Sequence, residues 1–92
     1  MRTKAETFAR KLGTRIATLR KDRDQAQGHL AMRAGVNKGY LSSIESGQRT
    51  PSLGVLLRLA AALRVGMADL LPEASARRTG RTRKAESRAA RG

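Results

Sequence analysis

The sequence contains no cysteine, one histidine and only two aromatic residues, Phe8 and Tyr40. The absence of cysteine excludes disulfides and thiolate metal sites, and a single histidine argues against a zinc site, so no cofactor or metal is expected. With two aromatic rings available, the core must be aliphatic. No apolar run approaches the roughly 20 residues that span a bilayer, and the charged N-terminus lacks the apolar stretch of a signal peptide. These absences predict a soluble, cytoplasmic protein.

Acidic residues are also scarce: seven Asp and Glu stand against 20 Lys and Arg, a formal net charge of +13. Such an excess indicates a polyanionic partner, either nucleic acid or an anionic membrane surface. The excess has two sources, because residues 1–72 carry 13 basic and five acidic residues and residues 73–92 carry seven and two. A chain of 92 residues has room for one small domain, which is marginally stable alone, so oligomerisation is expected.

The first 22 residues predict an amphipathic helix. Thr3 and Glu6 have the spacing of a capping box, in which a threonine side chain and a glutamate three residues later satisfy each other's backbone N–H groups. Apolar residues then recur at spacings of four, four and three, as one helix face requires: Phe8, Leu12, Ile16 and Leu19. We expect this helix to end near Asp22.

Two short helices follow, separated by a turn at Gly35. The first, about 27–34, starts poorly, because Ala26 offers no capping oxygen and Gly28 weakens a helix by roughly 1 kcal/mol. Gly35 is expected at its end with a positive φ. Asn37 is a good N-cap for the next helix, which the pair Ser46-Gly47 ends.

Two further helices complete the predicted domain, at 53–63 after a Ser52 cap and at 67–71 before Pro72. We expect the first of them to face the core with Leu53, Leu56, Leu57, Ala60 and Leu63. Residues 73–92 contain no Leu, Ile, Val, Phe or Met and cannot bury enough apolar surface to fold. The prediction is an all-α protein: a compact five-helix domain over 1–72 and a disordered basic tail over 73–92.

Four pieces of this sequence resemble the lambda-repressor/Cro-type helix-turn-helix family, also called the XRE family. They span about residues 12–71 and read LGTRIATLR, QxxLAxxAGV, YLSSIESGQRTPSL and LLRLAAALRV. The resemblance implies a lambda-repressor-like fold with its helix-turn-helix at about 27–45. The second helix of such a unit enters the DNA major groove, which is about 12 Å wide, and the first crosses the backbone.

The resemblance also implies a set of DNA-binding residues: Gln27, Asn37, Lys38, Gly39, Ser42, Ser43 and Arg49. Gln27 matches the position that contacts a phosphate at the start of the first helix of the unit. Lys38 and Gly39 match the leading base-reading positions, and a lysine can donate to guanine O6 and N7. Arg20 and Glu45 match a buried ion pair that links the first and third helices.

The sequence departs from the family pattern mainly at turns. Asp24 and Arg64 stand where glycine is usual, and Gly28 replaces a glutamate. These departures predict a weakly specified connection before Gln27 and strain at the end of the fourth helix.

The function that these features favour is a sequence-specific, double-stranded-DNA-binding transcriptional regulator, a repressor or operon controller of bacterial or phage type. We expect it to act as a homodimer on an operator, pairing through the fifth helix and its junction with the fourth. Two alternatives stay open: an antitoxin that pairs with a toxin, and a non-specific nucleoid or RNA-binding protein. An enzyme is not predicted, because no nucleophile is paired with a base. The operator sequence, the regulated genes and the sign of regulation are not specified.

Overall fold

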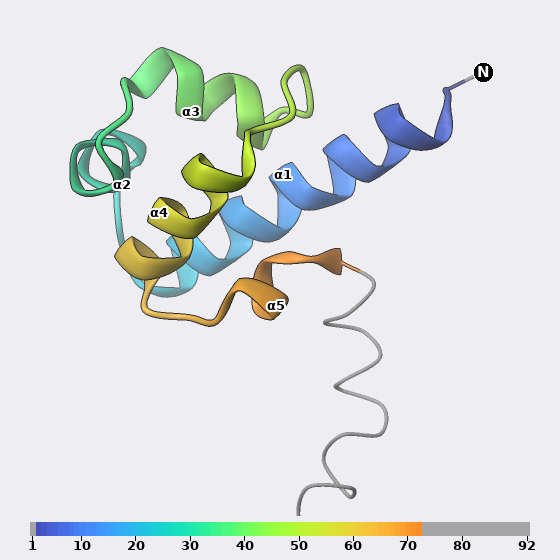
Figure 1. Ribbon diagram of the computed structural model, residues 1–92. Coiled ribbons are helices and arrows are strands. Elements are labelled where there is room, and N and C mark those ends of the chain that lie inside the picture. The colour runs from blue at the N-terminus through green and yellow to red at the C-terminus, as the bar shows by residue number, and fades with distance from the viewer. Residues whose placement is uncertain (1, 73–92) are drawn as a thin grey trace, which may run out of the picture.

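A computed structural model describes residues 2–72 of the 92-residue chain. It contains five helices in this range: α1 (Lys4–Asp22), α2 (Gln27–Ala34), α3 (Lys38–Glu45), α4 (Leu53–Leu63) and α5 (Met67–Leu70). The predicted five-helix, all-α domain is therefore confirmed. The predicted tail, 73–92, lies outside the described residues. Figure 1 shows α1 as the long central helix, with α3 above it, α5 below it and α4 overlapping its C-terminal half in this view.

Local sequence determines where most of these helices begin. Thr3 forms the predicted capping box, since its hydroxyl accepts from Glu6 N at 3.0 Å and the Glu6 carboxylate accepts from Thr3 N at 2.8 Å. Ser52 caps α4 through Val55 N. Ala26 contributes no side-chain cap to α2, as its apolar side chain requires.

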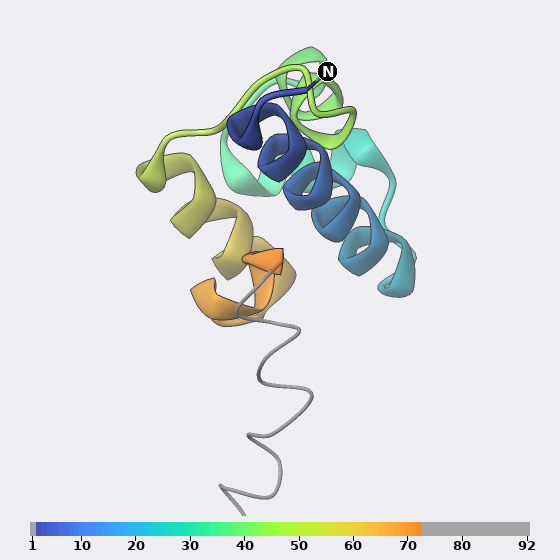
Figure 2. The ribbon, with the colours of Figure 1, turned by 90° about the vertical axis from the view of Figure 1, so that its right-hand side faces the viewer.

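The core is aliphatic, as the shortage of aromatic residues predicts. Its largest fully buried side chains come from all five helices: Leu12, Ile16, Leu30, Leu41, Ile44, Leu59, Leu63 and Leu70. Phe8, Tyr40 and Met67 pack against this core from its margin and are partly buried. Figure 2 shows α4 and α5 on one side of α1.

The predicted inner face of α4 is wrong in part. Leu56, Ala60 and Leu63 are buried as expected, but Leu53 is 66% exposed and Leu57 is 51% exposed. Val55 and Leu59 are buried instead. The helix is apolar almost all round, with Arg58 as its only charged residue, so periodicity did not select one face. The buried side is set instead by the packing of α4 against α2 and α5.

Candidate nucleic-acid interface

The segment between α2 and α3 is a sharp turn that sets the direction of α3. Gly35 ends α2 with φ 74°, the left-handed conformation that the sequence predicts. Asn37 then caps α3, because its side-chain oxygen accepts a hydrogen bond from Tyr40 N at 2.7 Å. Both ends of the turn are thus fixed by local chemistry, and α3 starts at a defined place.

The outer face of α3 is polar and small, and its inner face is completely buried. Leu41 and Ile44 are 0% exposed, while Lys38, Gly39 and Ser42 are exposed. Ser43 is half-buried, and its hydroxyl donates to the Gly39 carbonyl at 3.0 Å, so its oxygen stays available as an acceptor. Figure 1 places this helix along one edge of the domain, where a groove of DNA could receive it.

A close approach of two backbones holds the C-terminal end of α3 against α1. Gly13 lies on α1 at the contact, and a Cβ there would meet the carbonyl oxygens of Ile44 and Glu45, the latter at 2.6 Å. Rigid backbone occupies this space, so only glycine fits without moving α3. The position of the outer face of α3 therefore depends on a residue that lies outside it.

A buried ion pair fixes the same end of α3 from another direction. Arg20 Nε donates to Glu45 Oε2 at 2.8 Å, and Arg20 Nη2 donates to Glu45 Oε1 at 3.0 Å. The two side chains are 11% and 7% exposed. Arg20 Nη1 also donates to the Gln25 carbonyl at 2.7 Å. This arginine therefore joins α1, α3 and the connection between α1 and α2.

Gln27 is turned inward by the same network. Its Nε2 donates to Glu45 Oε1 at 2.9 Å, and the residue is half-buried at the start of α2. The resemblance leads one to expect a phosphate contact from this side chain. In the structure the amide N–H group serves Glu45, so Gln27 ties the start of α2 to the end of α3.

The connection before Gln27 carries the irregularities that the sequence predicts. Asp24 has φ 52°, where the family commonly has glycine. The side-chain oxygen of Gln25 is buried and has no hydrogen-bond partner among the described residues. An unsatisfied buried acceptor destabilises a fold. Two hydrogen bonds hold the loop in spite of it, from Arg20 to the Gln25 carbonyl and from Gln27 to Glu45.

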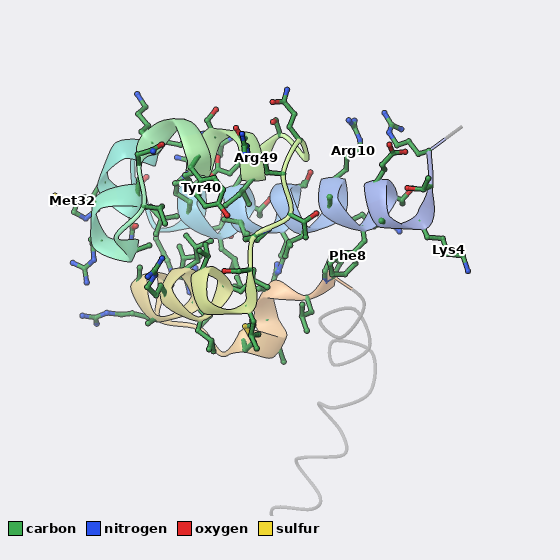
Figure 3. All side chains as sticks on the ribbon, turned by 45° about the horizontal axis from the view of Figure 1, so that its top comes forward. Lys4, Phe8, Arg10, Met32, Tyr40 and Arg49 are labelled. Carbon is green, nitrogen blue, oxygen red and sulfur yellow. The ribbon has the colours of Figure 1, made fainter. Side chains whose placement is uncertain are left out.

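Arg49 lies beside α3 on the loop that follows it. Its guanidinium is 6.0 Å from the centre of the Tyr40 ring, a cation–π distance. A shallow hollow of about 300 Å³ opens between them and is lined by Asn37, Gly39, Tyr40, Ser43 and Arg49. The structure thus gathers six of the seven predicted DNA-binding residues along one surface, and Gln27 faces Glu45 at its edge. Figure 3 shows Arg10, which the sequence analysis does not single out, on the same side.

Other kinds of site find no support in residues 2–72. No three acidic, histidine or cysteine side chains in this range come together to hold a metal ion. No helix in it combines the length and the apolar character needed to cross a membrane.

Known proteins share this arrangement. Residues 11–74 match the family described as a helix-turn-helix domain. The chain is 43% identical over 63 residues to the HTH-type transcriptional regulator SinR of Bacillus subtilis, which is 67% of this chain and 57% of SinR. It is 36% identical over 62 residues to the immunity repressor protein of Bacillus phage phi105, 67% of this chain and 43% of that protein. The chain thus spans only about half of these two relatives.

Solved structures agree with the sequence relatives. The restriction-modification controller protein C.AhdI of Aeromonas hydrophila superposes with a TM-score of 0.68 at 35% identity, covering 68% of this chain and 96% of that one. The clp gene regulator ClgR of Corynebacterium glutamicum superposes with a TM-score of 0.70 at 30% identity, covering 91% and 87%.

The chain belongs to the helix-turn-helix family of the Cro and lambda-repressor type.

In this helix-turn-helix protein, α2 (Gln27–Ala34) and α3 (Lys38–Glu45) are the two helices that the turn at Gly35 joins. The predicted family and its DNA-binding character are confirmed, and the family is one of regulators rather than enzymes. Membership of this family adds to the geometry the kind of partner, which is DNA. The buried network around Glu45 keeps the small, polar outer side of α3 in place.

Proposed function

We propose that this protein is a homodimeric transcriptional regulator that binds a roughly two-fold symmetric operator and reads it with α3. The observation that carries the proposal is the contrast between the two sides of α3. Leu41 and Ile44 are fully buried, and the opposite side presents only small or cationic groups. Such a helix can enter the major groove without steric conflict, while its buried side stays packed in the core. SinR, the phage repressor and C.AhdI, each named for regulation or control, support the regulatory role.

Each residue of the site has a separate proposed role. Lys38 opens the recognition helix and reaches a base edge, preferentially guanine. Gly39 lets the helix approach the bases closely, and Ser42 and Ser43 add short hydroxyl contacts. Asn37 and Arg49 lie at the margin and contact the phosphate backbone. Gln27 contributes its backbone N–H at the start of α2, since its side chain is held by Glu45.

The homodimer is proposed from the exposed face of α4. Leu53, Leu57 and Ala61 recur every four residues on this face and are all exposed, which gives an apolar stripe, hereafter the α4 stripe. Exposed apolar stripes of this kind commonly mark interfaces. Together with α5 and the α4–α5 junction, the α4 stripe would pair two copies about a two-fold axis. Two recognition helices would then lie about 34 Å apart, one turn of DNA.

Selection of bound DNA from a random pool tests the proposal and yields the operator, its symmetry and its half-site spacing. Competition at about 150 mM salt should then favour the selected site over random DNA by at least about 10³-fold. A flat preference would contradict the regulator and favour a non-specific nucleoid or RNA-binding protein. Co-purification of a stoichiometric toxin would favour the antitoxin instead.

Two variants and one control distinguish the proposed base contact of Lys38 from the contribution of the basic tail. Lys38→Ala should change the order of preferred sites as well as the affinity, because it removes a base contact. Lys11→Ala removes an exposed lysine that lies beside Pro72 and should leave site preference unchanged. Deleting residues 73–92 should weaken binding to every DNA alike and flatten its salt dependence, because fewer counterions are released. If Lys38→Ala and the deletion act alike, the assignment of Lys38 as a reader is wrong.

A further inference from the structure

Arg10 is a cation that the helix-turn-helix unit does not account for. It lies on α1 just before the stretch that matches the family, which begins at residue 11. Because α1 starts at Lys4, the helix extends seven residues, about 10 Å, beyond that stretch. Figure 1 shows this extension projecting past the end of α3 and its following loop. Its side chains can therefore reach DNA that α3 does not.

The loop after α3 packs on the stem of Arg10. Gly47 in this loop has φ 83°, and a Cβ added there would lie 2.6 Å from Arg10 Cγ and 2.9 Å from Arg10 Cα. The backbone of Gly47 thus sits directly on the first carbons of the arginine, and only glycine allows both this conformation and this approach. The stem of Arg10 is fixed beside the loop that carries Arg49, and the residue as a whole is exposed.

The direction and charge of Arg10 suit a polyanion. Figure 3 shows Arg10 and Arg49 on the side of the molecule where α3 presents its outer face, while Lys4 and Phe8 lie on the other side of α1. Glu6, one turn before Arg10, directs its carboxylate to Thr3 N. Within residues 2–72 the structure gives the Arg10 guanidinium neither a hydrogen bond nor an ion pair, and Arg20–Glu45 is the one ion pair in that range. The full charge of Arg10 is therefore available.

We infer that Arg10 is an additional DNA-backbone contact, which binds a phosphate next to those reached from the loop of Arg49. The N-terminal part of α1 thereby widens the interface beyond the helix-turn-helix unit. The inference rests on the proposed function, since it assumes that α3 is in the groove. Arg10 reads no base, because its stem is held over the loop and away from α3. Arg10 therefore contributes to the affinity for DNA and to the position of the protein along the duplex.

The test compares three variants on the selected operator and on random DNA. Arg10→Gln removes the charge but keeps the carbons on which Gly47 packs. Lys4→Gln removes the same charge from the opposite side of the same helix, and Arg10→Lys restores the charge. Arg10→Gln should lower the slope of log affinity against log salt by about 0.9 for each bound copy, hence about 1.8 for the proposed dimer, and weaken binding on the order of tenfold per copy at 50 mM salt. Lys4→Gln should leave the slope near wild type, and Arg10→Lys should recover most of it.

A phosphate-by-phosphate measurement keeps the inference testable even if a variant folds poorly. Neutral methylphosphonates placed singly along the operator should reveal one position in each half-site at which the wild type loses affinity and Arg10→Gln does not. An unchanged salt slope in Arg10→Gln, equal losses in Arg10→Gln and Lys4→Gln, or the absence of such a position would overturn the inference. Each of these results leaves the site preference of the wild type intact, so failure of the inference is distinct from failure of the proposed function.

Discussion

Glu45 is the residue through which the recognition helix is joined to the rest of the domain. Its carboxylate accepts two hydrogen bonds from Arg20 and one from Gln27, at 2.8 to 3.0 Å. Because the Glu45 side chain is only 7% exposed, these three hydrogen bonds take the place of nearly all its hydrogen bonds to water. A buried pair of this kind adds little net stability against an apolar alternative, but the loss of one partner leaves a charge without compensation.

Glu45→Gln should lower the free energy of unfolding by about 3 kcal/mol, because it leaves the Arg20 guanidinium buried without its counter-charge. Urea denaturation at one protein concentration measures the change. Glutamine has the shape of glutamate, but only one of its two terminal groups accepts hydrogen bonds, so the loss combines the missing charge with at least one missing hydrogen bond. Glu6→Gln is the matched control: it neutralises an exposed carboxylate, keeps a capping-box residue and should change little.

The double substitution Arg20→Met with Glu45→Leu should recover part of that loss, since no unpaired charge remains. Recovery is incomplete because the Gln25 carbonyl and the Gln27 amide lose their partners. If the double variant is as unstable as Glu45→Gln, the pair matters for its hydrogen bonds rather than for its charges. A free energy of unfolding near wild type for Glu45→Gln would contradict the argument directly.

At the scale of elements, helix ends could be predicted from the sequence and the orientation of α4 could not. Thr3, Gly35, Asn37 and Ser52 act through hydrogen bonds or backbone angles within a few residues, so local sequence determines them. The face that α4 buries depends on α2 and α5, because a helix that is apolar all round carries no periodic signal. The inward orientation of the Gln27 side chain was also missed, because its partner Glu45 lies 18 residues away in the sequence.

The end of α4 offers a stability prediction. Arg64 has φ 60° and ψ 44°, a left-handed conformation that disfavours any residue with a Cβ. Arg64→Gly should raise the free energy of unfolding by about 1 kcal/mol, because glycine adopts this conformation without the steric penalty. Thermal or urea denaturation measures the gain.

Arg64→Ala provides the control for that substitution. It removes the same charge from the C-terminal end of α4, where a cation is mildly favourable, but it keeps the Cβ. We expect no gain from alanine. Equal gains from glycine and alanine would attribute the effect to the removed guanidinium and not to backbone strain.

At the scale of the whole molecule, the DNA-binding surface and the dimer surface that we propose lie apart from each other. Figure 3 shows α3, Arg49 and Arg10 on one side of α1, and α4, which carries the α4 stripe, on the other side. A single recognition helix contacts only a few base pairs, so specificity over a genome requires a second copy. On the proposed function, the separation of the two surfaces would let one copy bind DNA and a second copy of the chain at the same time.

The α4 stripe gives the prediction that links assembly to function. Replacing Leu53 and Leu57 with serine should convert a dimer to a monomer in sedimentation equilibrium, because the exposed apolar contact between copies is removed. Operator affinity should fall about 100-fold or more, since each half-site must then be bound independently. Met32→Ser is the control, because Met32 is 69% exposed but lies on α2, outside the α4 stripe. A wild type that is monomeric at micromolar concentration would refute the dimer, and a dimer that survives both serines would place the interface outside the α4 stripe.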